Sequence, residues 1–91
     1  PVMVPNAFTP DGDQFNNIFK PVFYESQVCK LYIYNRWGEL IHFAEEMDAS
    51  WDGSHMNGSI VSDGIYIWKI IYNDYKTGLP VEIQGHVTLL R

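Results

Sequence analysis

Apolar and polar residues alternate along most of this chain with a period of two, which is typical of β-strands. The segment Val28 to Asn35 shows this most cleanly. One of its faces carries Cys29, Leu31 and Ile33, and the other carries Lys30, Tyr32 and Tyr34. Residues Ile65 to Asn73 form the strongest predicted strand, with its expected core face made of Tyr66, Trp68, Ile70 and Tyr72. The pattern therefore predicts half-buried strands through the centre of the chain.

Turn residues divide the rest of the chain into further short segments. The other expected strands are Val2 to Phe8, Ile18 to Phe23, Glu39 to Ala44 and Leu79 to Arg91, the last with Ile83, Val87 and Leu89 on one face. Thr9 to Gly12 is a type I turn signal, and Asn35 to Gly38 is the tip of a hairpin. Glu45 to Ser50 could form a short helical turn, and Gly85 suggests a bulge or bend.

About seven short strands at this spacing predict an all-β fold, an immunoglobulin-like antiparallel β-sandwich, with a small barrel as the alternative. Ninety-one residues fit one domain, expected to be monomeric. Hydrophobic residues are 46% of the chain, enough for a core. The single cysteine, Cys29, excludes an internal disulfide and is expected to be buried.

The net charge of −5 argues against general attraction to nucleic acid or anionic lipid. No apolar run approaches the roughly 20 residues of a membrane-spanning helix, so membrane insertion is not expected. The chain opens with Pro1 instead of Met, and its strand pattern continues to Arg91. We therefore expect residues 1–91 to be the C-terminal domain of a longer polypeptide.

Five segments, in order, match one family pattern. They are residues 4–13 (Val-Pro-Asn-Ala-Phe-Thr-Pro-Asp-Gly-Asp), 33–39 (Ile-Tyr-Asn-Arg-Trp-Gly-Glu), 51–53 (Trp-Asp-Gly), 63–68 (Asp-Gly-Ile-Tyr-Ile-Trp) and 85–91 (Gly-His-Val-Thr-Leu-Leu-Arg). The chain thus resembles the gliding-motility-associated C-terminal domain of Bacteroidetes surface proteins, a type B sorting domain of the type IX secretion system.

This resemblance implies a C-terminal address that carries a passenger from the periplasm across the outer membrane to the cell surface or beyond. It also implies two partners, the type IX translocon and a PorP-type outer-membrane protein. The residues expected to contact a partner are Arg36, Trp37, Gly38, Val87, Thr88, Leu90 and Arg91. Those expected to determine the fold are Pro5, Asn6, Phe8, Pro10, Trp51, Asp52, Gly53, Gly64, Tyr66 and Gly85.

The sequence does not decide whether Trp37 is exposed, whereas Trp51 is expected to have a packing role. Trp37 is either an exposed recognition tip, or it folds back over the sheet with Arg36 stacked on it. Trp51 is expected to pack in the core or to cover the sheet, with Asp52 capping backbone N–H groups of its own turn.

Oxygen-bearing side chains cluster after the first turn, as they would in a Ca²⁺ loop; they are Asp11, Asp13, Asn16 and Asn17. Phe15 stands where such a loop needs an acid or amide, and the segment departs from the family pattern here as well. Asx turns account for the same residues. We therefore predict no metal and no cofactor.

No nucleophile–base pair, metal-spaced histidines or phosphate loop is visible, so catalysis is not expected. The three Trp and six Tyr residues leave a second hypothesis open, an immunoglobulin-like adhesive or glycan-binding module of a cell-surface protein. Aromatic residues also fill small β cores, which favours secretion targeting.

Overall fold

The computed structural model describes residues 2–10, 17–23 and 27–90, and within them the chain is all β. The seven strands in these residues are β1 (Val2–Met3), β2 (Ala7–Phe8), β3 (Val22–Phe23), β4 (Val28–Tyr34), β5 (Leu40–Met47), β6 (Gly64–Asn73) and β7 (Pro80–Leu89). One sheet has five strands in the order β2-β7-β6-β4-β5, and β1 pairs with β3 in a second sheet. The prediction of an all-β chain with about seven strands is confirmed.

The two central strands of the large sheet, β4 and β6, divide their side chains between a buried face and an outer face. Leu31 pairs with Ile70 and Ile33 pairs with Trp68 across the strands, and all four side chains are buried. The predicted core face of β6 and the predicted burial of Cys29 are therefore confirmed, although Tyr72 only packs against the edge of the core. The residues between them along each strand point to the outer face, because successive side chains of a strand alternate.

The second layer of the core comes from irregular segments as much as from strands. Phe19 and Trp51 are both fully buried, and their backbones exchange two N–H···O=C bonds of 2.9 Å. Phe8 from β2 lies between them, 6.1 Å from the Phe19 ring and 5.3 Å from the Trp51 ring. In addition, Phe23 of β3 meets Tyr72 edge-on at 5.1 Å. Aromatic rings thus join the small sheet and the loops to the large sheet.

A β-bulge that the sequence pattern did not reveal lies in the β4–β5 hairpin. The register shifts between Ile33 and Tyr34, which pair with His42 and Leu40, so Ile41 is the extra residue. Ile41 is 3% exposed, and the His42 Nε2 lies 2.8 Å from the Ser50 carbonyl oxygen. The bulge therefore turns two successive residues of β5 toward the core.

Two expected strands near the N-terminus are shorter than predicted. The segment Val2 to Phe8 divides into β1 and β2, which belong to different sheets, with Pro5 between them. Proline has no N–H to donate to a ladder, so continuous pairing through it is not available. From Ile18 to Phe23, only Val22 and Phe23 form a strand. The type I turn expected at Thr9 to Gly12 extends beyond the described residues.

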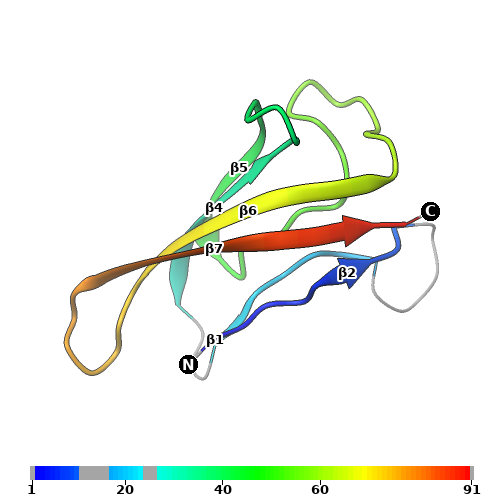
Figure 1. Cartoon of the computed structure of the whole chain (residues 1–91). Helices are drawn as coiled ribbons and strands as arrows, with labels where there is room; N and C mark the ends of the chain where they lie inside the picture. The colour runs from blue at the N-terminus through cyan, green and yellow to red at the C-terminus, as the bar shows by residue number, and fades with distance from the viewer. Residues whose placement is uncertain (1, 11–16, 24–26, 91) are drawn as a thin grey trace.

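Three expectations in the second half of the chain need correction. The helical turn at Glu45 to Ser50 is wrong, because β5 continues to Met47 and Asp48 then turns with φ of +56°. The last strand ends at Leu89. A bulge at Gly85 is also wrong, since the β6–β7 register runs without a shift from Gly64 to Asn73. Figure 1 shows β6 and β7 as one long hairpin, with β2 beside only the end of β7.

Candidate partner-recognition surface

The β4–β5 hairpin tip is held in one conformation by the side chain of Asn35. Its Oδ1 accepts hydrogen bonds from the backbone N–H groups of Trp37 (3.0 Å) and Glu39 (2.9 Å). Its Nδ2 donates to the Glu39 carboxylate at 2.8 Å. Gly38 turns the chain with φ of +84°, a conformation that side-chain-bearing residues rarely adopt. These bonds position the residues of the tip before any partner arrives.

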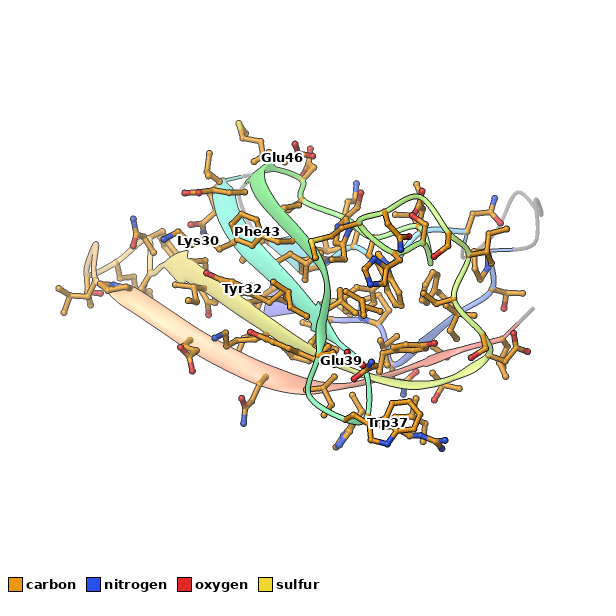
Figure 2. All side chains as sticks on the ribbon, turned by 90° about the horizontal axis from the view of Figure 1, so that it is seen from above. Lys30, Tyr32, Trp37, Glu39, Phe43 and Glu46 are labelled. Atoms are coloured by element: carbon orange, nitrogen blue, oxygen red, sulfur yellow. The ribbon has the colours of Figure 1, made fainter. Side chains whose placement is uncertain are left out.

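Trp37 stands out from the molecule at this tip. Its side chain is 72% exposed, and the Arg36 guanidinium lies 4.4 Å from the ring centroid. Figure 2 shows Trp37 at the end of the hairpin, beyond the body of the sheet. The stacking of Arg36 on Trp37 is confirmed, whereas the expectation that Trp37 folds back over the sheet is wrong. Exposed Trp and Arg side chains are the residue types that most often dominate binding energy at interfaces.

A shallow groove of about 570 Å³ connects this tip to the last strand. We call it the recognition groove; its lining residues are Arg36, Gly64, Ile65, Ile67 and His86. A smaller hollow of about 150 Å³ on the tip side is lined by residues 35–37 and 62–66. Ile65 is 59% exposed. The groove therefore has an apolar floor between the Arg36 and His86 side chains.

The terminal strand contributes some of its expected residues to this end of the molecule. Thr88 pairs with Ile65, and Leu90, just past β7, is 52% exposed. Val87 is fully buried, so we leave it out of the proposed contact surface. Arg91 lies outside the described residues. The structure thus brings the hairpin tip and the outer face of β7 together across Ile65.

Sequence reasoning missed three residues of the groove, Ile65, Ile67 and His86. The alternation of β6 already placed Ile65 and Ile67 opposite the core face. An isoleucine predicted to face solvent on a strand is a signal of partner contact that could have been used.

Three of the residues expected to determine the fold form one aromatic cluster. Trp51 is fully buried, 5.3 Å from the Phe8 ring and 5.2 Å from the Tyr66 ring. The Trp51 Nε1–H donates to the Ser54 carbonyl at 2.8 Å, and the Tyr66 hydroxyl donates to the Ser62 carbonyl at 2.6 Å. The expected core position of Trp51 is confirmed.

The first and last sequence motifs meet in the large sheet. The Asn6 carbonyl accepts a hydrogen bond from Thr88 N–H (2.9 Å), and the Phe8 carbonyl accepts one from Leu90 N–H (3.0 Å). Pro5 and Pro10, on either side of β2, are half-buried. The N-terminal motif therefore fixes the position of the terminal strand.

Asp52 caps its own turn, as predicted. Its Oδ1 accepts hydrogen bonds from the Ser54 hydroxyl (2.6 Å) and the Ser54 N–H (3.1 Å). The side-chain bond from Ser54 is the main reason that the pKa of Asp52 lies below its ordinary value. Gly53 follows with φ of +88°. The role of these residues here is to shape the loop after Trp51.

Two observations concern the capacity of the described residues for nucleophilic attack and for metal binding. Burial raises the pKa of the Cys29 thiol, which makes it a poor nucleophile at neutral pH. Among the described residues, no three His, Cys, Asp or Glu side chains gather closely enough to hold a metal ion. The predicted absence of a metal site in the loop Asp11 to Asn17 stays a prediction, because only Asn17 of that loop belongs to the described residues.

The described part of the chain forms no helix with the length and apolarity needed to cross a membrane.

Comparison with known proteins gives a family and a fold. The model of the CHU_C type IX secretion signal domain matches residues 2–89. Among solved structures, the chain is similar to PorZ of Porphyromonas gingivalis, described as an essential bacterial surface component of the type IX secretion system. The TM-score is 0.59 at 19% identity, and the match covers 99% of this chain but 11% of the PorZ chain. At that identity the likeness shows the fold alone. No curated protein matches the chain significantly.

Proposed function

This chain belongs to the family of type IX secretion signal domains, and we propose that its folded surface, with no catalytic step of its own, directs an attached passenger through that system. Membership makes it a secretion-targeting domain whose signal serves export across the outer membrane toward the cell surface. We propose that residues 1–91 act as the C-terminal domain of a longer protein, that the passenger crosses the periplasm first, and that a PorP-type outer-membrane protein is a partner. We also propose that the two sheets pack as an immunoglobulin-like sandwich.

We place recognition at the hairpin tip and the recognition groove because one continuous surface joins Arg36 and Trp37 to the outer face of β7. Asn35 holds the tip in place, which lowers the entropy cost of binding. The exposed Trp37 can anchor in a partner pocket, while Ile65 and Ile67 supply an apolar contact area beside it. Thr88 and Leu90 extend the same surface at the end of β7.

A reporter fused to residues 1–91, expressed in a bacterium with type IX secretion, tests this assignment. The wild-type fusion should reach the cell surface, and a fusion without the domain should not. The double variant Trp37→Ala/Ile65→Ser should remain inside the cell envelope, although its melting temperature should stay close to that of the wild type, because both side chains are largely exposed.

Leu79→Ser is the matched control, since Leu79 is 64% exposed but lies at the β6–β7 turn, outside the recognition groove. It should leave export unchanged. Normal export of Trp37→Ala/Ile65→Ser would remove the groove from the recognition surface. Export of the fusion that lacks the domain would overturn the targeting function for this chain.

A further inference from the structure

The large sheet ends in β5, and among the described residues one side of this strand has no neighbouring strand. β5 pairs only with β4, whereas β4, β6 and β7 each lie between two other strands. The Ile41 carbonyl accepts a hydrogen bond from the Met56 N–H at 2.8 Å, so the loop after Trp51 covers the first part of β5. No described residue outside β4 bonds to the backbone of residues 43–47. We call residues 43–47 the open edge.

The direction of the backbone groups along the open edge follows from the strand register. The Thr88 N–H donates to Asn6, next to β2, so the even-numbered residues of β7 face β2 and the odd-numbered ones face β6. Carried across the paired positions of β6 and β4, this alternation turns the even-numbered residues after the bulge of β5 toward β4. Phe43, Glu45 and Met47 therefore each direct one N–H and one C=O away from the sheet, where an added strand would bind.

The side chains of the open edge define the kind of strand that it can accept. Phe43 is 40% exposed and Met47 is 53% exposed, and both lie on the outer face with Glu45 between them. Glu46 is exposed on the opposite face, beside the half-buried Ala44. Figure 2 shows Phe43 and Glu46 along β5. An added strand thus meets apolar side chains and carboxylates in a fixed order.

Negative charge exceeds positive charge at this edge. Glu45 and Glu46 end β5 together with Asp48, which follows the strand, and Lys30 on β4 is the basic residue paired with Glu45. No basic side chain of the described residues forms an ion pair with any of these three carboxylates. The open edge is therefore complementary to basic side chains.

A second copy of the chain fits this edge poorly. In antiparallel pairing of two β5 strands, a register centred on position 45 puts Glu45 opposite its own copy, and one centred on position 46 does the same for Glu46. Like charges directly opposite each other destabilise a strand pair. A register centred on position 44 brings the second strand to Ile41, whose carbonyl is already bonded to Met56. The carboxylates thus keep copies apart, as charges on edge strands do.

From these observations we propose that the open edge binds an extended, basic segment of another protein, which adds to the large sheet as a further strand. Backbone hydrogen bonds to Phe43, Glu45 and Met47 hold the segment in register. Its lysine or arginine side chains lie opposite Glu45 and Glu46, and its apolar side chains pack beside Phe43 and Met47. No residue of the open edge lines the recognition groove, so this binding is separate from secretion targeting.

Two-dimensional NMR of the 91-residue chain, titrated with peptide to millimolar concentration, tests the proposal. The probe is acetyl-Thr-Val-Lys-Lys-Thr-Val-Thr-amide. In antiparallel register its lysines lie opposite Glu46 and Glu45, and its valines lie beside Met47 and Phe43. The amide signals of residues 43, 45 and 47 should shift, and their hydrogen exchange should slow, because they become donors to the added strand.

The other side of the sheet provides an internal control. β2 pairs with β7 only at Thr88 and Leu89, so the N–H groups of Glu82, Gln84 and His86 point to the same side as β2 but beyond its end. These three amides should not respond to the probe, because Glu82 is the only carboxylate among them.

Peptide controls separate strand pairing from charge attraction. The probe with glutamate in place of both lysines should not bind. A probe that carries an N-methyl group on its second lysine should not bind either, because that residue can no longer donate to the Glu45 carbonyl.

Protein variants test the two carboxylates. Glu45→Gln/Glu46→Gln should weaken binding about tenfold, since two cross-strand charge pairs are lost. Glu45→Lys/Glu46→Lys should lose the lysine probe and bind the glutamate peptide. Glu82→Lys, a charge reversal at an exposed position outside β5, should leave binding unchanged. All these side chains are exposed, so the melting temperatures should stay close to that of the wild type, and they identify any variant that fails to fold.

Three outcomes would overturn the proposal. The first is no change at residues 43, 45 and 47 with the lysine probe at millimolar concentration. The second is equal binding of the N-methylated probe, which would mean charge attraction without strand pairing. The third is protection of the same amides in the chain alone that rises with protein concentration, because a second copy would then occupy the open edge.

Discussion

The indole ring of Trp68 lies across the backbone of Gly85 on the neighbouring strand. The two residues pair in the β6–β7 ladder, and a Cβ atom at position 85 would stand 2.6 Å from the Trp68 Cζ2. The indole Nε1–H then donates to the carbonyl of His86, the next residue, at 3.1 Å. Gly85 is therefore required by the close approach of a ring, and the strand continues through it without a bulge.

Gly85→Ala should destabilise the protein because Trp68, which is 9% exposed, has little room to move. Overpacking of this kind costs about 1–3 kcal/mol, and urea unfolding measures it directly. Trp68→Phe removes the ring atoms that the new methyl group would meet. In a double-mutant cycle, Gly85→Ala should cost clearly less in the Trp68→Phe background. An equal cost in both backgrounds would show that the indole is not the cause.

Asn35→Ala should loosen the hairpin tip without unfolding the sheet. The change leaves the N–H groups of Trp37 and Glu39 without their acceptor, and we expect a loss of about 1 kcal/mol in stability. Hydrogen exchange of these two amides should accelerate. The amides of β6 and β7 should lose only the protection that follows from the lower free energy of global unfolding. Export of the reporter fusion should fall because the tip is no longer preorganised. Unchanged exchange at Trp37 and Glu39 would contradict the role given to Asn35.

The Asp52 carboxylate should stabilise the loop only when it is ionised. Its pKa in the folded state lies below that of an unfolded chain, about 3.9. Its contribution is thus present above about pH 4 and is lost as the pH falls through the folded-state pKa. The stability difference between the wild type and Asp52→Ala should accordingly be largest near neutral pH and shrink in acid. A gap that stays constant from pH 7 to pH 2.5 would argue against the Ser54 hydrogen bonds as its origin.

Cys29 should be unreactive in the native protein. Burial raises the pKa of its thiol, so little thiolate forms at neutral pH, and the side chain is only 2% exposed to a reagent. Labelling with a disulfide reagent at pH 8 should be slow in buffer and complete at once in denaturing urea. Arg91→Glu, a change at the chain terminus, is a suitable comparison that should label at the wild-type rate. Rapid labelling of the folded wild-type chain would contradict this prediction.

Local pattern was sufficient for the long strands. In β4, apolar residues alternate with polar or aromatic residues over several positions, so its two faces could be separated without knowing the partner strands. In β6 both faces are largely apolar, and Lys69 marked the outer one. The short strands β1, β2 and β3 have two residues each, which is too few for a period to be recognised. Their existence depends on which distant backbone groups are available to pair.

The residues of the candidate recognition surface also fall into two groups, those that the local sequence revealed and those that required the tertiary structure. The tip residues Arg36 and Trp37 were recognisable from the turn sequence alone, because Asn35 and Gly38 mark a hairpin. Whether Trp37 points outward or packs on the sheet depends on the bulge and twist of the hairpin, which the alternation does not contain. The contribution of His86 required the β6–β7 register, since that pairing places it opposite Ile67 in the groove.

By itself, the sequence determined the all-β class, the two faces of the central strands, the burial of Trp51 and the family, because each of these rests on local residue order. Only the tertiary structure decided that β2 runs parallel to β7, that Gly85 receives the Trp68 ring, and that the hairpin tip meets the outer face of the last strand. The reason is physical. A strand's period states which side chains share a face, whereas strand order and close approach arise from contacts between residues far apart in the chain.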